Sequence, residues 1–318
     1  MPRILILGAT SFVAGYIMDL VTDQEVIALT RGERKHLSPR TGHWVEHVVY
    51  TSENLEKFLS QYRPHAIINC IGTGSRSTLN LSPLESYTRL YQSQCEISMH
   101  LFEAIRRISA YAPRVVLFGS AAEYGVSKEE KKYTESSVAQ PQTWYGLTKL
   151  FQTETALLYR REYGLDVIVL RPSNIIGVGL PLGFFLSDII AQLKAVPRGV
   201  QAVTLLLGNI DSVRDFISVE AVAQSVAWLI QGEKKVAPVL NCSSGQGVML
   251  RTVVEIVAIW WKERFQQEVL VKARADLPFS SSTFSVLDNT RLAALGCPFP
   301  KQSLETMIHH ILLKEFSI

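Results

Sequence analysis

The alternation of strand-like and helical segments over the first 170 residues constrains the fold more than any other feature. Short apolar runs rich in β-branched residues recur along this part of the chain, and stretches with helical periodicity separate them. The predicted strands are Ile4–Leu7, Val26–Leu29, Val45–Tyr50, Ala66–Ile71, Val115–Phe118 and Val167–Leu170. Because these strands are unbroken apolar runs, we expect a parallel sheet of βαβ units with both faces covered.

After Pro172 this rhythm breaks. Gly and Pro cluster in residues 177–183, and mixed strands, helices and loops follow. The run Val239–Asn241 is predicted to return to the first sheet, and a helix is predicted near Thr252–Phe265. We therefore predict an α/β fold: a Rossmann-type doubly wound parallel sheet with a smaller C-terminal α/β substrate lobe. The expected division assigns residues 1–172 and about 217–245 to the dinucleotide-binding domain, and 173–216 and 246–318 to the lobe.

Composition excludes several classes of protein. Hydrophobic residues make up 47% of the 318 residues and charged residues 19%, so the chain can bury a large core and is not disordered. The net charge is only +3 without a long basic run, so we expect no nucleic-acid partner. No apolar stretch reaches the roughly 18 residues of a membrane span, so we expect no membrane partner either.

The cysteines and histidines predict neither disulfides nor a metal site. Cys70, Cys95, Cys242 and Cys297 form no Cys-x-x-Cys pair, which indicates free thiols in a reducing compartment, and hence a cytoplasmic protein. Residues 43–47 match the His-x-x-Glu-His pattern of zinc proteases. That pattern needs a helix, whereas the following valines favour a strand, so we expect no metal.

The first strand runs into a turn typical of dinucleotide-binding proteins. Gly8 allows a tight turn, and the N-terminus of the helix that follows presents N–H groups to a pyrophosphate. Ser11 and Ala14 stand where glycine is usual, so an ordinary βα turn remains an alternative. Arg31 follows the second strand and favours a 2′-phosphate, hence NADP. Glu33 keeps NAD open, and a solvated Arg31 is the other alternative.

Tyr145 and Lys149 are a candidate acid/base pair. They lie four residues apart, on one face of a predicted helix. We expect the ammonium to lower the pKa of the phenol and so make it useful near neutral pH. The predicted buried stripe of this helix consists of Leu147, Leu150, Phe151 and Leu158.

Two further polar residues follow predicted strands. Ser120 comes directly after Val115–Phe118, and Asn174 follows Val167–Leu170. Ligands of open α/β sheets bind at the carboxyl ends of the strands. We therefore expect the Ser120 hydroxyl to hold a substrate carbonyl at that edge.

In the order and spacing of its motifs, nearly the whole chain resembles the extended short-chain dehydrogenases/reductases of the NAD(P)-dependent epimerase/dehydratase type. The motifs are Gly8–Gly15, Ser120, Tyr145 with Lys149, Leu170–Asn174, Val213–Phe216, Leu240–Gly245 and Arg274–Asp276. The resemblance implies that Ser120 and Tyr145 polarise and protonate a carbonyl, while Lys149 also holds the nicotinamide ribose. It further implies that Asn174, Arg214 and Arg274 face the sugar and diphosphate of a nucleotide sugar. Pairing of Arg214 with a carboxylate such as Asp215, and a surface position for Arg274, are the alternatives.

The same resemblance narrows the reaction. The family's dehydratases carry acidic residues just after the catalytic Ser or Thr, where this chain has Ala121 and Ala122. The segment from Gly177 to Phe216 and the Thr30–Arg31 pair are similar to the GDP-6-deoxy-D-mannose reductases. We therefore expect an NADPH-dependent 4-ketoreductase of a nucleoside-diphosphate 4-keto-6-deoxyhexose. A nucleotide-sugar 4-epimerase and a non-catalytic NADP-binding sensor or scaffold are the alternatives.

The expected contacts of the two ligands and the assembly follow from this reading of the motifs. We expect the substrate to touch Ser120, Ala121, Asn174, Arg214 and Arg274. The expected cofactor contacts are Gly8, Thr10, Ser11, Phe12, Val13, Arg31, Cys70, Ile71, Gly72, Tyr145, Lys149 and Pro172. Related enzymes dimerise through the helix of the Tyr–Lys pair and the one before it. This predicts a homodimer through Leu150–Tyr163 and Tyr91–Ile108.

Overall fold

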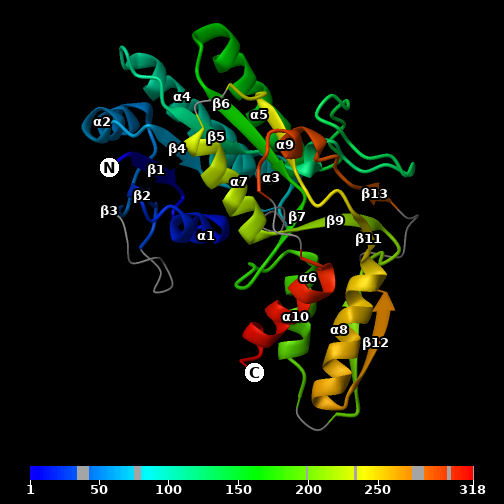
Figure 1. Cartoon of the computed structure of the whole chain (residues 1–318). Helices are drawn as coiled ribbons and strands as arrows, with labels where there is room; N and C mark the ends of the chain where they lie inside the picture. Colours follow the sequence, from blue (N-terminus) through cyan, green and yellow to red (C-terminus); the bar gives the residue numbers. More distant parts are fainter. Residues whose placement is uncertain are drawn as a thin grey trace.

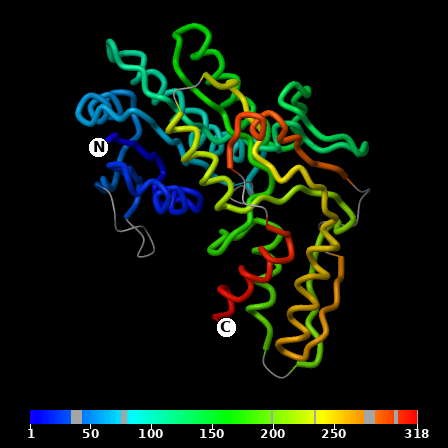
Figure 2. The backbone as a smooth tube through the Cα atoms, in the orientation of Figure 1, coloured from blue at the N-terminus to red at the C-terminus, as the bar shows by residue number. Residues whose placement is uncertain are grey.

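The computed structural model describes residues 1–33, 43–74, 80–197, 200–232, 235–273, 283–298 and 302–317. A large parallel sheet with helices on both faces occupies the upper part of Figure 1. Below it lies a smaller group of helices and short strands, built from the second half of the chain. The C-terminal helix α10 packs in this lower group (Figure 2).

The larger sheet has seven strands, every pair of which is parallel. In spatial order the strands are β10 (Val239–Cys242), β6 (Val167–Pro172), β5 (Arg114–Phe118), β4 (Ala66–Asn69), β1 (Arg3–Leu7), β2 (Glu25–Leu29) and β3 (His43–Val45). The chain order reverses between β1 and β4, which creates the crevice where ligands of such sheets bind. The predicted doubly wound sheet is confirmed, including the return of the strand near Val239 beside β6.

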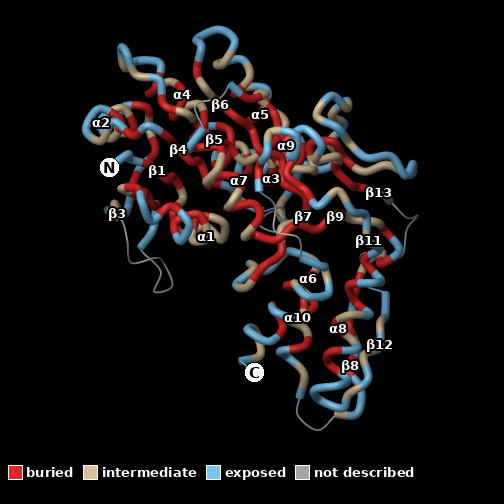
Figure 3. Tube along the Cα trace, viewed as in Figure 1, coloured by how far each residue is buried: buried red, intermediate tan, exposed pale blue. Residues whose placement is uncertain are grey.

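Alternating residues of each strand enter two separate cores. In β1, Ile4 and Ile6 face one core, while Leu5 and Leu7 face the other. Both cores are buried throughout (Figure 3), which explains why the strands carry no polar alternation. The first core is covered by α1 (Phe12–Leu20), α7 (Val219–Gln231) and α9 (Thr290–Ala294). The second is covered by α2 (Ser52–Tyr62), α4 (Ile97–Arg107) and α5 (Trp144–Tyr163).

A helix of unusual form precedes α4. The helix α3 (Pro83–Tyr91) begins with a capping box at Ser82 and continues into the π-helix η2 (Gln92–Glu96).

Helix α5 begins at the Thr143 cap, whose hydroxyl accepts the Gly146 N–H at 3.0 Å. It ends at Gly164, where a φ of 70° favours glycine.

The smaller region has its own core. A four-stranded sheet is formed by β7 (Asn174–Ile176), β9 (Val213–Ser218), β11 (Gly247–Met249) and β13 (Phe284–Ser285). A parallel pair, β8 (Ala202–Leu207) with β12 (Glu268–Ala273), lies below it (Figure 1). Around them pack α6 (Phe185–Lys194), α8 (Leu250–Phe265) and α10 (Leu304–Glu315). The division into a cofactor domain and a substrate lobe stays a prediction, because it concerns what each part binds.

Two local predictions were wrong. The strand predicted over Val45–Tyr50 ends at Val45, because His47 adopts a φ of 55° and turns the chain away. The stripe predicted to be buried on α5 is largely exposed: Leu147, Phe151 and Leu158 are each 41–45% exposed. The buried face of α5 instead carries four polar residues, Thr148, Lys149, Gln152 and Thr153, together with Gly146 and Ala156.

Three further properties concern the described part of the chain. No helix in the described ranges is long and apolar enough to cross a bilayer. Among the described residues, no three His, Cys, Asp or Glu side chains are grouped so that they could hold a metal ion. The four cysteines are buried as free thiols.

Candidate active site

The turn after β1 requires glycine. Gly8 has a φ of 71°, and a Cβ atom there would lie 2.9 Å from Cγ1 and 3.0 Å from the backbone N of Ile71. The turn can therefore lie directly against the end of β4. The Ser11 hydroxyl then caps α1 by accepting the Ala14 N–H at 3.4 Å. The first-turn N–H groups at Phe12 and Val13 have no intrahelical acceptor, so they fit an anionic group such as a pyrophosphate.

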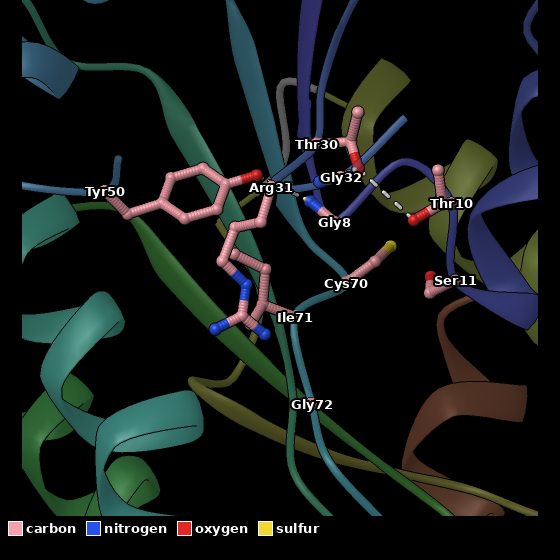
Figure 4. A pocket seen from close by; sticks show the side chains of 10 residues that line it. All are labelled: Gly8, Thr10, Ser11, Thr30, Arg31, Gly32, Tyr50, Cys70, Ile71 and Gly72. Carbon is pink, nitrogen blue, oxygen red and sulfur yellow. Dashed lines mark hydrogen bonds between the residues drawn. The ribbon is translucent and has the colours of Figure 1, made fainter. Parts of the chain in front are cut away.

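A cavity of about 270 Å³ opens beside this turn (Figure 4). The Tyr50 hydroxyl donates to the Leu29 carbonyl at 3.0 Å and accepts the Gly8 N–H at 3.4 Å, so it ties the turn to the end of β2. The hydroxyls of Thr10 and Thr30 lie 3.3 Å apart across the same strands. The lining residues are Gly8, Thr10, Ser11, Thr30, Arg31, Gly32, Tyr50, Cys70, Ile71 and Gly72.

Three of these lining residues, Thr30, Gly32 and Tyr50, were not among the predicted cofactor contacts. Tyr50 was assigned to a strand, and the only signal for another role was that a buried tyrosine hydroxyl needs a hydrogen-bond partner. Burial raises the pKa of Tyr50 to about 12, so this group stays a neutral hydrogen-bonding phenol.

Arg31 lies between two cavities. It borders the cavity beside the turn after β1, which we call the phosphate turn (residues 8–11). In this cavity the Arg31 side chain extends past the Tyr50 ring (Figure 4). With Tyr50 it also lines a second cavity of about 510 Å³, which His47, Glu96 and His100 border as well. Glu33 is exposed and lines neither of these two cavities.

Ser120 follows β5 and is held by the short 3₁₀ helix η3 (Ala121–Glu123). Its backbone N–H donates to Oε1 of Glu123 at 2.8 Å, and its hydroxyl accepts the Ala122 N–H at 3.1 Å. Glu123 is fully buried, and its other oxygen binds the Arg171 guanidinium at 2.7 Å. This ion pair was not predicted, although the Ser-x-x-Glu spacing of a capping box was present at Ser120.

Tyr145 lies in the first turn of α5, next to Ser120. A hydrogen bond with the Ser120 side chain lowers the pKa of Tyr145. Burial, together with the negative charge of Glu123, has the larger effect and raises that pKa above its usual value. The expectation that Lys149 would lower the Tyr145 pKa is therefore not met, because desolvation dominates.

Lys149 is almost completely buried, with 3% of its surface exposed. Its Nζ donates to the Phe118 carbonyl at 2.8 Å and to Oε1 of Gln152 at 3.1 Å. A Cβ on Gly72 would lie 3.7 Å from this Nζ, so the amine reaches the loop that borders the first cavity. Burial lowers the pKa of Lys149 to about 8.

Asn174 and Arg214 line a common cavity of about 90 Å³ in the smaller region, together with Phe184 and Phe216. The Asn174 amide donates to the Asp215 carbonyl at 2.8 Å. The aromatic walls and the guanidinium give this cavity one apolar and one cationic side.

The partners of Arg214 are all neutral within the described ranges. Its guanidinium donates to the carbonyls of Val213 and Thr283 at 2.8 and 2.9 Å, and to the Thr283 hydroxyl at 2.9 Å. Asp215 instead accepts from the Ser173 and Ser244 hydroxyls, at 3.0 and 2.7 Å. The predicted alternative, a carboxylate partner for Arg214, is therefore not found.

The remaining predicted residues are placed as follows. Ala121 begins η3 next to Ser120, and Pro172 is buried at the end of β6. Arg274 lies outside the described residues. Seven of the predicted cofactor residues line the first cavity, namely Gly8, Thr10, Ser11, Arg31, Cys70, Ile71 and Gly72. Phe12, Val13, Tyr145, Lys149 and Pro172 do not line it. Asn174 and Arg214 meet in the second sheet.

The fold and the turn after β1 define a dinucleotide-binding α/β protein. The profile of the NAD dependent epimerase/dehydratase family matches residues 4–242, and the chain belongs to this family. It is therefore an enzyme of the NAD(P)-dependent oxidoreductase type.

Two curated relatives and one solved structure illustrate the similarity. A dTDP-6-deoxy-L-talose 4-dehydrogenase (NAD(P)(+)) of Kitasatospora kifunensis is 25% identical over 80% of this chain and 78% of its own. A GDP-6-deoxy-D-mannose reductase of Pseudomonas aeruginosa is 27% identical over 51% of this chain and 53% of its own. The structure of RMD from Pseudomonas aeruginosa complexed with NADPH has a TM-score of 0.76 at 22% identity, and covers 100% of this chain and 99% of that one.

Proposed function

We propose that this protein is an NADPH-dependent 4-ketoreductase of a nucleoside-diphosphate 4-keto-6-deoxyhexose. The observation that carries the proposal is that Tyr145 pairs with Ser120, while Lys149, one turn further along α5, reaches Gly72 of the cavity beside the turn after β1. The names of the two relatives, a dTDP-6-deoxy-L-talose 4-dehydrogenase and a GDP-6-deoxy-D-mannose reductase, support the substrate class.

In this proposal Tyr145 is the proton donor. Its raised pKa keeps the phenol protonated at neutral pH, which is the state that a general acid needs. The Ser120 hydroxyl, oriented by Glu123 through η3, holds the same carbonyl oxygen. The bound nicotinamide supplies the hydride. Lys149, as an ammonium, stabilises the negative charge that develops on the phenol and holds a ribose hydroxyl.

Arg31 supports NADPH rather than NADH. Its position between the two cavities suits a phosphate on the adenosine ribose, with the pyrophosphate in the cavity of the turn and the adenine in the larger one. A guanidinium binds phosphate through paired hydrogen bonds. Glu33, the residue that would favour NAD, lies outside both cavities.

The substrate diphosphate is assigned to Arg214, with Asn174 at the sugar side. Arg214 is a partly buried cation with neutral partners only among the described residues, so an anionic ligand would complete its environment. Arg274 and Ala121 complete the proposed substrate contacts.

We further propose a homodimer. The outward face of α5 exposes Trp144, Leu147, Phe151 and Leu158, each 41–45% exposed. Aromatic rings of α3 continue this apolar surface, since the ring centroids of Tyr87 and Trp144 lie 6.2 Å apart. A second copy of the same face would cover it isologously. Light scattering should give about twice the 35.6 kDa of one chain, and Leu147→Glu with Phe151→Glu should give monomers.

The decisive experiment measures NADPH oxidation with 4-keto-6-deoxyhexoses carried on GDP, dTDP, CDP and UDP, with products identified by NMR. Stoichiometric oxidation with formation of a 6-deoxyhexose supports the reductase. Interconversion of two nucleotide sugars without net NADPH consumption identifies the 4-epimerase instead. Tight NADPH binding without turnover of any of these sugars would rule out this substrate class.

A further inference from the structure

A group of buried polar side chains lies behind Lys149, between α4, α5 and the end of β4. We call it the amide cluster; its members are Asn69, Gln94, Ser98 and Gln152, and none is more than 1% exposed. Burying polar groups in an apolar layer is unfavourable unless each is hydrogen-bonded. All four of these side chains are hydrogen-bonded, and the bonds lead from the cofactor-side loop to the Lys149 amine.

Gln152 is the member that contacts Lys149. Its Oε1 accepts the Lys149 Nζ at 3.1 Å, while its Nε2 donates to the Gln94 carbonyl at 2.8 Å and to the Ser98 hydroxyl at 2.7 Å. The opposite amide orientation would place the NH₂ group against the ammonium and the oxygen against a carbonyl. The surroundings therefore allow only one orientation of this amide.

Gln94 lies in the π-helix η2. Its backbone carbonyl accepts hydrogen bonds from two side chains, the Ser98 hydroxyl at 2.7 Å and the Gln152 amide at 2.8 Å. The Gln94 side chain meanwhile donates to the Thr73 carbonyl at 2.9 Å and accepts the Thr148 hydroxyl at 3.0 Å. Helix α5 is thus fixed to the loop after β4 through η2.

A second path reaches the same loop. Ser98 accepts the Asn69 amide at 3.1 Å, and Oδ1 of Asn69 accepts the Ile71 N–H at 3.0 Å. Ile71 lines the cavity beside the phosphate turn and contacts Gly8. The position of the Gln152 amide is therefore tied to the backbone that borders the cofactor cavity.

We propose that Gln152 is a positioning residue that holds the Lys149 amine on the Phe118 carbonyl and beside Gly72 of the loop 70–74. The proposal rests on the role assigned to Lys149 under the proposed function. Both hydrogen-bond acceptors of Lys149 are neutral, namely the Phe118 carbonyl and Gln152. The titratable groups that face it are Glu123 of η3, Cys95 of η2 and Cys70 after β4, none of which is hydrogen-bonded to the amine among the described contacts.

The test compares Gln152→Glu with Gln152→Met in the enzyme without cofactor or substrate. The pKa of Lys149 is measured from the ¹³Cε shift of labelled lysine, assigned with Lys149→Met. A carboxylate at position 152 should raise this pKa by about one to three units. Loss of the acceptor in Gln152→Met should lower it by about one unit, because a hydrogen bond to a charged group is removed. An unchanged pKa in both variants would overturn the proposal.

Turnover gives a second, independent measurement. Because the ammonium is the working form, activity should fall as the pH rises through the Lys149 pKa. The alkaline limb of the kcat profile should therefore move to higher pH in Gln152→Glu and to lower pH in Gln152→Met. A merely structural role would lower kcat equally at every pH. The alkaline limb would then stay in place in both variants, which would contradict the proposal.

Gln192→Met is the matched control. Gln192 of α6 also exchanges two hydrogen bonds with a backbone, at Leu206, but lies in the smaller region. This variant should lose its hydrogen bonds to Leu206 without moving the Lys149 pKa. If Gln152→Met does not fold, the nearly isosteric Gln152→Glu still decides the question.

The two proposals fail separately. A shift of the Lys149 pKa in an enzyme that reduces none of the 4-keto sugars supports the positioning role and overturns the ketoreductase. Normal reduction with an unshifted pKa supports the ketoreductase and overturns the positioning role.

Discussion

Arg171, which is buried, and Arg214, which is partly buried, lie in neighbouring parts of the molecule, and their surroundings differ. Arg171, at the end of β6, binds the fully buried Glu123 at 2.7 Å and the Tyr124 hydroxyl at 2.8 Å. Arg214, in β9, has only neutral partners within the described part of the chain. The Arg171 charge is neutralised inside the protein by Glu123, and the same carboxylate accepts the Ser120 N–H. The Arg214 charge has no carboxylate partner among the described residues, and in the proposed function it binds the substrate diphosphate.

This difference separates chemistry from binding. Changes around Ser120 and α5 should lower kcat or stability, because in the proposed function these residues bind the reacting carbonyl or position the residues that do. Changes around Arg214 should raise KM and leave the fold intact. The four predictions below test that separation, from the largest expected effect to the smallest.

Tyr145→Phe should lower kcat by roughly two to four orders of magnitude, the usual contribution of a positioned general acid. NADPH affinity should be preserved, because the ring remains. Stopped-flow turnover and fluorescence titration of NADPH measure the two quantities. Near-normal turnover would remove Tyr145 from the mechanism.

Arg171→Met should lower the free energy of unfolding by about 3–5 kcal/mol, because Glu123 would be left as an uncompensated buried charge. Arg214→Met should lower it by only about 1 kcal/mol, since only hydrogen bonds to neutral groups are lost. Urea unfolding of both variants makes the comparison. Equal losses would show that Arg214 is a structural cation like Arg171.

Arg214→Ala should raise KM for the nucleotide sugar by about 10- to 100-fold, the range expected for one hydrogen-bonded charge pair. NADPH affinity should stay the same, and the free sugar should remain a very poor substrate for both proteins. Reduction of simple apolar ketones with no loss in Arg214→Ala would rule out this substrate class.

Arg31→Ala should narrow the preference for NADPH over NADH by about 1.5–3 kcal/mol, the value of a hydrogen bond between charged groups. Dissociation constants for both cofactors, measured with both proteins, give the difference. Glu33→Ala is the matched control and should leave the preference unchanged. Equal affinities in the unmodified protein would transfer ribose recognition to Glu33.

The sheet was predictable because both of its faces are buried. Strands of this kind are short apolar runs, and their spacing in the chain specifies the βαβ order. The prediction failed at the edge strand β3, where His47 turns the chain and frees Tyr50 to reach Gly8. An apolar run at a sheet edge does not reveal where pairing stops.

Helix α5 shows the opposite limit. Its apolar stripe was taken as the buried side, yet the buried side carries Thr148, Lys149, Gln152 and Thr153. Periodicity shows that a helix has two faces. It does not show which face meets the protein and which meets another chain or solvent.

By itself, the sequence determined the parallel sheet, the phosphate turn and the identity of the residues at the strand ends, because these depend on local spacing and on glycine geometry. Only the tertiary structure decided their electrostatics. Burial and Glu123 raise the Tyr145 pKa against the expected influence of Lys149, and Gln152 reaches Lys149 through a cluster assembled from β4, η2, α4 and α5. Desolvation and hydrogen bonding depend on what surrounds a group in space, and residues distant in the chain supply most of those surroundings.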